Sequence, residues 1–204
     1  MKVIGITGGV GSGKSTVVGI LQKHLNTVFL HCDVIAHDLM EPGESAYEEL
    51  VRVFGESVLN PDRTIQRSAL YEAAFPTGRV AELNACVHPK VREYIEKEIK
   101  RCREGGFEGI VLIEAALLLE AGYRDICDEI WFIMTPEWMR RERLFKNRGY
   151  SREKTDSIMA EQSDEDFFMK NSDFVIYNDS SFEECEEHIM RQVLKHLKGE
   201  AQGE

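Results

Sequence analysis

The segment from Gly8 to Ser15, Gly-Gly-Val-Gly-Ser-Gly-Lys-Ser, has the clearest chemical meaning in the chain. It fits the phosphate-loop template, in which a glycine and four variable residues precede Gly13, Lys14 and a serine or threonine. Such a loop turns backbone N–H groups inward around phosphate oxygens, where a Cβ atom would block the approach. The sequence therefore predicts a site for the phosphates of a nucleoside triphosphate.

Individual roles follow from the chemistry of this loop. The ammonium of Lys14 can span the β- and γ-phosphates, and the hydroxyl of Ser15 is placed to hold Mg²⁺. A helix that starts at Lys14 adds its dipole to the anion site. A dinucleotide-binding loop would need the spacing G-x-G-x-x-G, which this segment breaks. We assign nucleotide binding to Gly9, Gly11, Ser12, Gly13, Lys14, Ser15 and Thr16.

Asp33 follows the second expected strand, so the fold would bring its carboxylate beside the phosphate loop. A carboxylate there can accept the proton of an attacking hydroxyl and orient its oxygen in line with the γ-phosphate. The alternative role is the N-cap of a helix that starts near Val34. A kinase is therefore one hypothesis. A non-catalytic nucleotide-binding protein, which has no use for an acceptor-site acid, is another.

The densest basic run of this acidic chain lies between residues 137 and 154. Arginines that close over a transferring phosphoryl group stabilise its charge, by ~10³–10⁵ in rate for an arginine finger. Such residues belong on a mobile lid that excludes water. The alternative is a solvated helix face, paired with neighbouring glutamates. We choose Arg143 and Arg148 as the functional arginines and keep Arg140 in reserve.

Short apolar runs alternate with helical patterns, as in a parallel sheet with crossover helices. Five strands are expected, at Val3–Thr7, Thr27–Cys32, Gly109–Ala115, Glu129–Met134 and Phe174–Tyr177. A helix over Lys14–Leu25 follows the first strand. The fold class is α/β: a three-layer α/β/α P-loop kinase fold with a five-stranded parallel sheet, a helical substrate-binding insertion and a lid.

The stretch from about residue 36 to residue 104 shows helical patterns and no clear strand. Helices are expected at Ser45–Phe54, Arg67–Phe75 and Pro89–Arg103, and a closing helix at Phe182–Leu197. We interpret residues 1–198 as a single kinase domain and 199–204 as a tail. Its core is expected at 1–35, 105–136 and 172–198, the insertion at about 36–104 and the lid at about 137–160.

The composition of the chain limits its expected cellular location and binding partners. The 204 residues carry a formal net charge of −11, and a surface of this sign repels polyphosphate, so general nucleic-acid binding is not expected. No apolar run is long enough to span a bilayer, and a strand that begins at Val3 leaves no room for a leader segment. Five scattered cysteines without a Cys-x-x-Cys pair are typical of a reducing cytoplasm. We expect a cytoplasmic protein without a membrane partner, and a monomer is favoured.

Several classes of P-loop protein fit less well. Guanine-specific GTPases usually carry Asn-Lys-x-Asp and transporter ATPases Leu-Ser-Gly-Gly-Gln, and neither string occurs. Chain length and the helical stretch after the second strand favour a small-molecule kinase, whose acceptor sits across the carboxyl ends of the strands. A shikimate-type site wants glycines after the central strand, whereas Gly105 and Gly106 precede it. Another small-molecule kinase, such as a nucleoside, nucleotide or shikimate kinase, stays an alternative.

More specific motifs resemble those of the dephospho-coenzyme A kinases, and the resemblance runs over nearly the whole chain. Its markers are Asp33-Val34-Ile35-Ala36, Glu41-Pro42-Gly43, Gln66-Arg67, Leu83-Asn84, His88-Pro89, Leu117-Leu118-x-Glu120, Pro136-Glu137 and Val175-Ile176-x-Asn178. The resemblance implies MgATP-dependent phosphorylation of the ribose 3′-hydroxyl of dephospho-coenzyme A, which is the last step in making coenzyme A.

The same resemblance implies roles for single residues. Asp33 would be the base or orienting group for the hydroxyl. Arg67 and His88 would help to hold the phosphates and ribose of the substrate, with Pro89 at the first position of a helix. Asn178 would lie near the adenine of the nucleotide.

The chain departs from the family pattern at five places. His31 and Cys32 replace the first two residues of a frequent Asp-Ala-Asp, and Ala116 stands where a proline is usual. Glu114 replaces an aspartate at the end of the central strand, where it could act on Mg²⁺ through water. The lid is one residue longer than usual before Arg148, and serines replace the glycine that often follows Asn178.

Overall fold

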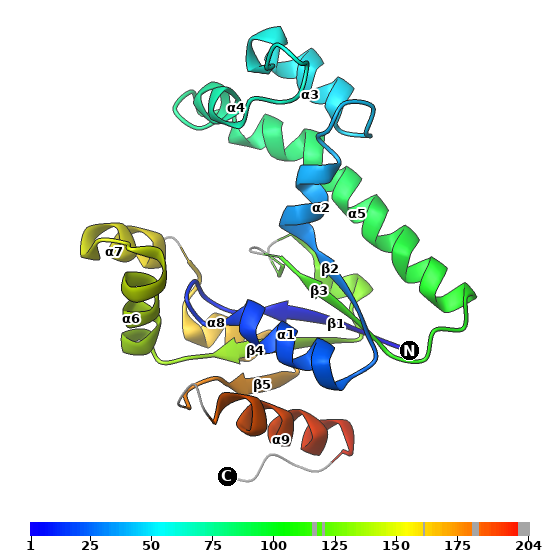
Figure 1. Ribbon diagram of the computed structural model, residues 1–204, viewed down its shortest axis with the longest axis vertical. Helices are drawn as coiled ribbons and strands as arrows, with labels where there is room; N and C mark the ends of the chain where they lie inside the picture. Colours follow the sequence, from blue (N-terminus) through cyan, green and yellow to red (C-terminus); the bar gives the residue numbers. More distant parts are fainter. Residues whose placement is uncertain (116–117, 120, 161, 181–183, 200–204) are drawn as a thin grey trace. The chain divides into compact units, whose positions relative to one another are not determined.

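The computed structural model describes residues 1–115, 118–119, 121–160, 162–180 and 184–199 (Figure 1). Two compact units form by their internal contacts. The first unit consists of Met1–Phe29 and Phe107–Glu204, and the second of Leu30–Gly106. No helix among the described residues is long and apolar enough to cross a membrane.

A five-stranded sheet with the order β2-β3-β1-β4-β5 is the centre of the fold. Its strands are β1 (Lys2–Thr7), β2 (Thr27–His31), β3 (Ile110–Glu114), β4 (Glu129–Met134) and β5 (Phe174–Tyr177). β1 pairs in parallel with β3 and with β4, and β4 pairs in parallel with β5. Every residue of β3 is buried, as expected of a parallel strand covered on both faces. The predicted α/β class and parallel sheet are confirmed.

Helices of the first unit cover both faces of this sheet. They are α1 (Lys14–His24), the short 3₁₀ helix η2 (Tyr123–Ile126), α6 (Glu137–Arg148), α7 (Arg152–Ala160), α8 (Glu165–Lys170) and α9 (Cys185–Leu197). The buried sides of α1 and α9 pack with Ile4, Ile6 and Trp131 in one apolar cluster. On the opposite face, Phe168 of α8 stacks on Phe132, with ring centroids 5.2 Å apart. The alternation of side chains along β4 produces this layering, because Trp131 and Phe132 point to opposite faces.

The second unit is helical. It contains α2 (Cys32–Asp38), α3 (Tyr47–Phe54), the 3₁₀ helix η1 (Glu56–Val58), α4 (Arg67–Ala74) and α5 (Val80–Glu104). α2, α3 and α4 each pack on α5. The apolar stripe of α5 buries Val91, Ile95, Ile99 and Cys102, as the helical spacing predicts.

The start of α5 corrects one prediction. Pro89 was expected at the first position of a helix, but it lies inside α5, which begins at Val80. A proline within a helix removes one backbone donor and clashes with the preceding turn, so propensity alone favours a break there. The helix continues because Cys86 and Val87, on the turn before Pro89, are buried. The predicted helix start at His88 and Pro89 is therefore wrong.

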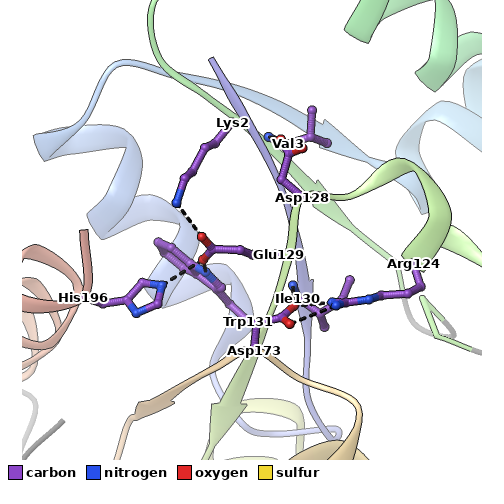
Figure 2. Close-up of polar contacts among 9 residues, drawn as sticks. All are labelled: Lys2, Val3, Arg124, Asp128, Glu129, Ile130, Trp131, Asp173 and His196. Carbon is purple, nitrogen blue, oxygen red and sulfur yellow. Dashed lines mark hydrogen bonds and ion pairs between the residues drawn. The ribbon is translucent and has the colours of Figure 1, made fainter. Parts of the chain in front are cut away.

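Glu129 joins three elements at the amino-terminal edge of the sheet (Figure 2). Its carboxylate accepts hydrogen bonds from Lys2 on β1, from Trp131 Nε1 at 2.7 Å and from His196 Nε2 at 2.8 Å on α9. A carboxylate only accepts, so Nε2 is the ring nitrogen of His196 that carries hydrogen. The His196 ring also stacks on Phe174, with centroids 4.0 Å apart.

Two aspartates extend the strand pairing at the same edge (Figure 2). Asp128 Oδ2 accepts from the backbone N–H of Val3, and Asp173 Oδ2 accepts from that of Ile130, each at 2.7 Å. Arg124 donates to both oxygens of Asp173. The hydrogen bonds from Arg124 lower the pKa of Asp173. Burial by itself would raise the pKa of Glu129, but the bonds from its three donors outweigh burial and lower the pKa from 4.5 to about 2.

We expect Glu129→Gln to lower the free energy of unfolding by about 1.5–3 kcal/mol at pH 7, because an amide N–H would face donors that need an acceptor. Glu187→Gln on α9 is the matched control, since its exposed pair with Arg191 contributes only about 0–1 kcal/mol. Urea unfolding followed by circular dichroism measures both. Equal unfolding free energies for the two variants would contradict the role of Glu129.

The depressed pKa of Glu129 also predicts how stability depends on acid. Stabilisation by this carboxylate is fully present above the ordinary pKa of 4.5 and is lost as the pH falls toward about 2. Unfolding free energies measured between these pH values should therefore fall more steeply for the wild type than for Glu129→Gln. Parallel curves would show that the carboxylate is not the group responsible.

Candidate nucleotide-binding site

The predicted phosphate loop connects β1 to α1, with Gly13 as the N-cap residue of the helix. Gly11 and Gly13 have φ angles of 79° and 84°, a region that favours glycine. The N-cap Gly13 has no side chain that could cap α1, so the first turn of this helix presents its backbone N–H groups toward the loop. These features are those of an anion site built from backbone.

The carbonyl of Ser12 is held from outside the loop. It accepts from Asn178 Nδ2 at 2.8 Å, from Thr135 Oγ1 at 3.0 Å and from Arg143 Nη1 at 3.4 Å. In a planar trans peptide the N–H points opposite to the C=O. The N–H of Gly13 therefore points away from these donors, toward the inside of the loop. Such a fixed donor can bind a phosphate oxygen without reorganisation.

The donors come from the carboxyl ends of two neighbouring strands. Thr135 follows β4, Asn178 follows β5, and the backbone N–H of Asn178 bonds to Met134 O at 2.9 Å. Asn178 is 1% exposed, and its Oδ1 accepts from the thiol of Cys185 at 3.4 Å. Its side chain is thus occupied by bonds that support the loop, on the side away from the phosphate cradle.

Arg140 of α6 lies against the other half of the loop. Its Nε donates to the carbonyl of Val10 at 2.9 Å. A Cβ on Gly9 would come within 2.3 Å of Arg140 Nη2, so a side chain at this position would displace the guanidinium. Burial lowers the pKa of Arg140, yet an arginine side chain keeps its charge in proteins.

The other polar groups of the loop differ in their surroundings. Lys14 Nζ donates to the carbonyl of Gly8 at 2.8 Å, while Ser15 and Thr16 are exposed. Ser12 Oγ is buried and finds no hydrogen-bond partner among the residues that the structure describes. Glu114 is buried at the end of β3, where it pairs in register with Ile6, one residue before the end of β1.

The predicted acceptor-site residues all belong to the second unit. Asp33 is exposed in the first turn of α2, which begins at Cys32. It is therefore not the N-cap residue of this helix, which was the alternative role. Arg67 is the exposed first residue of α4, and His88 is exposed within α5. In the described part of the chain, none of the three side chains forms a hydrogen bond or an ion pair.

The basic run between residues 137 and 154 separates into three kinds of residue. Arg140 and Arg143 bond to loop carbonyls, whereas Arg141 pairs with Glu137 and Asp156. Arg148 is the exposed last residue of α6 and has no partner within the described ranges. The assignment of Arg143 and Arg148 to catalysis stays a prediction.

Sequence reasoning missed two residues that contact the loop and its supports. Thr135 shares its hydroxyl between the carbonyls of Ser12 and Asn178, at 3.0 and 3.1 Å. Gln162 Oε1 accepts from the backbone N–H of Val10 at 2.9 Å. Neither residue lies in a recognisable motif; the only sequence signal is the place of Thr135 directly after an apolar strand.

Comparison with known proteins points to one family. A sequence model described as dephospho-CoA kinase matches residues 2–184. The dephospho-CoA kinase of Moorella thermoacetica is 38% identical over 177 residues, which cover 86% of this chain and 83% of that protein. The crystal structure of TT1252 from Thermus thermophilus superposes with a TM-score of 0.80 at 30% identity, covering 99% of this chain and 98% of that one. The dephospho-CoA kinase from Campylobacter jejuni shares the fold, with a TM-score of 0.72 at 22% identity over 97% and 98% of the two chains.

We expect Asn178→Asp to lower the unfolding free energy by about 1–3 kcal/mol and to weaken nucleotide binding, because a buried carboxylate would face the Ser12 carbonyl. Asn26→Asp is a matched control: Asn26 Nδ2 also bonds a backbone carbonyl, that of Glu108 at 2.8 Å, but at an exposed site. Thermal unfolding with and without MgADP measures both effects. A stable Asn178→Asp protein that MgADP stabilises like the wild type would contradict the support assigned to Asn178.

Proposed function

The chain belongs to the dephospho-CoA kinase family, and we propose that it transfers the γ-phosphate of ATP to the ribose 3′-hydroxyl of dephospho-coenzyme A. The product is coenzyme A, and the reaction is the last step of its biosynthesis. The observation that carries the proposal is the backbone of the phosphate loop, whose Val10 and Ser12 carbonyls are bonded outward so that the N–H groups that follow them point inward. An enzyme of phosphoryl transfer needs fixed donors of this kind around the phosphates.

Two side chains of the first unit fit a magnesium ion held with ATP. The Ser15 hydroxyl is exposed at the start of α1, and the Glu114 carboxylate ends the strand next to β1. Mg²⁺ usually takes one or two protein oxygens and completes its shell with phosphates and water. The described residues contain no cluster of three or more acidic, histidine or cysteine ligands, which suits that shared mode of binding. Bound Mg²⁺ would neutralise charge on the β- and γ-phosphates.

The reaction itself needs an oriented hydroxyl and a stabilised phosphoryl group. In this proposal the carboxylate of Asp33 accepts a hydrogen bond from the ribose 3′-hydroxyl, orients its oxygen toward the γ-phosphorus and takes its proton as the new P–O bond forms. The bond between the γ-phosphorus and the β–γ bridging oxygen of ATP breaks in the same transfer, and ADP leaves. Lys14 balances the charge on the β- and γ-phosphates. Arg143 and Arg148 of the lid add positive charge where negative charge spreads over the equatorial oxygens, Arg143 after it exchanges its bonds to the carbonyls of Ser12 and Asn178 for phosphate oxygens.

The second unit supplies the remaining acceptor contacts in this proposal. Arg67 and His88 bind the phosphates and ribose of dephospho-coenzyme A, and their exposure, without side-chain partners among the described residues, supports that assignment. Asn178, which supports the loop, also lies near the adenine of ATP in this proposal. The five scattered cysteines without a Cys-x-x-Cys pair support a cytoplasmic enzyme. A net charge of −11 supports one that binds small anions locally and does not bind nucleic acid.

A coupled assay for ADP release tests the substrate assignment. Dephospho-coenzyme A, adenosine, pantetheine phosphate and shikimate are offered in parallel with MgATP. We expect turnover of dephospho-coenzyme A with a kcat/KM at least about 100-fold above that of the others, since buried polar contacts of a site reject analogues that leave them unpaired. Absence of turnover with dephospho-coenzyme A, or preference for another acceptor, would refute the proposal.

Asp33→Asn should lower kcat by ~10²–10⁴, the usual range for a positioned acid–base group, and leave the affinity for ATP nearly unchanged. Asp38→Asn is the matched control, because Asp38 lies on the same helix with a side chain 74% exposed. Steady-state kinetics and calorimetric titration with ATP separate the two effects. Loss of ATP binding in Asp33→Asn, or an equal loss of turnover in Asp38→Asn, would assign Asp33 a structural role.

A further inference from the structure

Gln162 connects the segment after α7 to the tip of the phosphate loop. Its Oε1 accepts from the backbone N–H of Val10 at 2.9 Å and from Arg140 Nη2 at 3.1 Å. Both neighbours are donors, so the side-chain atom between them is the oxygen, and its two lone pairs are both used.

The same arginine fixes the other side of Val10. Arg140 Nε donates to the carbonyl of Val10 at 2.9 Å, while Gln162 holds the N–H of that residue. The two peptide groups that flank Val10 are therefore both fixed. Because N–H and C=O are antiparallel in a trans peptide, the N–H of Gly11 points away from Arg140.

We propose that Gln162 is a positioning residue for nucleotide binding: together with Arg140, it locks the Val10 peptides so that the Gly11 N–H faces the phosphates. A flip of the Val10–Gly11 peptide would aim a carbonyl oxygen at the phosphates in place of a donor. Gly11, with φ at 79°, has no Cβ to resist such a flip, and the contacts of Val10 with Arg140 and Gln162 supply a restraint. The inference rests on the proposed ATP-dependent activity.

Arg140 and Gln162, which we call the Val10 clamp, leave the loop backbone little room to move. Arg140 is half-buried, and the Cβ positions of Gly9 and Gly11 would lie 2.3 Å from its Nη2 and 2.9 Å from its carbonyl oxygen. The loop thus rests directly on α6. Arg140 of α6 and Gln162, which follows α7 in the chain, thus hold the two peptide groups on either side of Val10.

The test replaces the acceptor and keeps the size of the side chain. Gln162→Met removes Oε1, and Gln162→Asn withdraws it by one methylene while staying polar, which keeps the test open if the methionine variant does not fold. Gln192→Met is the matched control, because Gln192 Oε1 accepts from the backbone N–H of Tyr177 at the same distance, 2.9 Å, on α9. Titration calorimetry gives the Kd for MgADP, and hydrogen exchange reports on the amides of residues 8–13.

Both Gln162 variants should bind MgADP about 10- to 100-fold more weakly, as expected when one donor to a charged group is misaligned. KM for ATP should rise in the same proportion, KM for dephospho-coenzyme A should stay unchanged, and the loop amides should exchange faster. Gln192→Met should leave all four quantities close to wild type. Wild-type MgADP affinity and loop exchange in both Gln162 variants would overturn the inference, as would an equal loss in Gln192→Met.

The binding measurement separates this inference from the proposed function. MgADP titration needs no acceptor, so it decides the role of Gln162 even if the wild type does not phosphorylate dephospho-coenzyme A. If only turnover of dephospho-coenzyme A fails, the substrate assignment is refuted. If only the expected loss of MgADP affinity in the Gln162 variants fails, the positioning role of Gln162 is refuted.

Discussion

The fixed direction of a trans peptide is the constraint on which this site depends. Because C=O and N–H point opposite ways, the inward donors of the phosphate loop are set by the partners of its outward carbonyls. Asn178 and Thr135 hold the carbonyl of Ser12, and Arg140 holds that of Val10. A loop rich in glycine cannot maintain this arrangement by itself, since its backbone loses the most conformational freedom on folding. The side chains behind the loop are therefore as much part of the anion site as the glycines.

The parallel sheet explains why side chains that bond to the phosphate loop gather at its carboxyl-terminal edge. Different side chains lie at its amino-terminal edge. The carboxyl ends of β4 and β5 deliver Thr135 and Asn178 side by side, next to the end of β1 where the loop starts. The amino-terminal edge instead carries the acids Asp128, Glu129 and Asp173, which accept from backbone N–H groups and basic side chains (Figure 2). The backbone N–H groups at the amino-terminal ends of the strands thus find acceptors at the edge opposite the phosphate loop. The side chains at the carboxyl-terminal edge can then bond to the loop.

Much of this was accessible from the sequence because it is local. The spacing from Gly8 to Ser15 and the apolar runs of the strands are patterns of neighbouring residues, and the structure reproduces them within one or two residues. The position of Pro89 within α5 was not predictable from propensity, since buried neighbours such as Cys86 decide that the helix continues. The contacts of Gln162, 152 positions from Val10, carry no local signal, and choosing among the lid arginines needs the packing of α6 on the loop.

The glycines of the loop are crowded on two sides, by the phosphate that the motif binds and by the side chains that support the loop. A Cβ on Gly13 would lie 2.4 Å from Asn178 Nδ2, and one on Gly9 would lie 2.3 Å from Arg140 Nη2. Both clashes are with the supporting side chains, and not with a ligand. The template is usually explained by the close approach of phosphate to backbone. In this chain the outer side of the loop is crowded as well. A side chain at Gly9 would push the Arg140 guanidinium aside, and one at Gly13, whose φ is 84°, would also strain the backbone, so either substitution would disturb the supporting contacts even without a nucleotide.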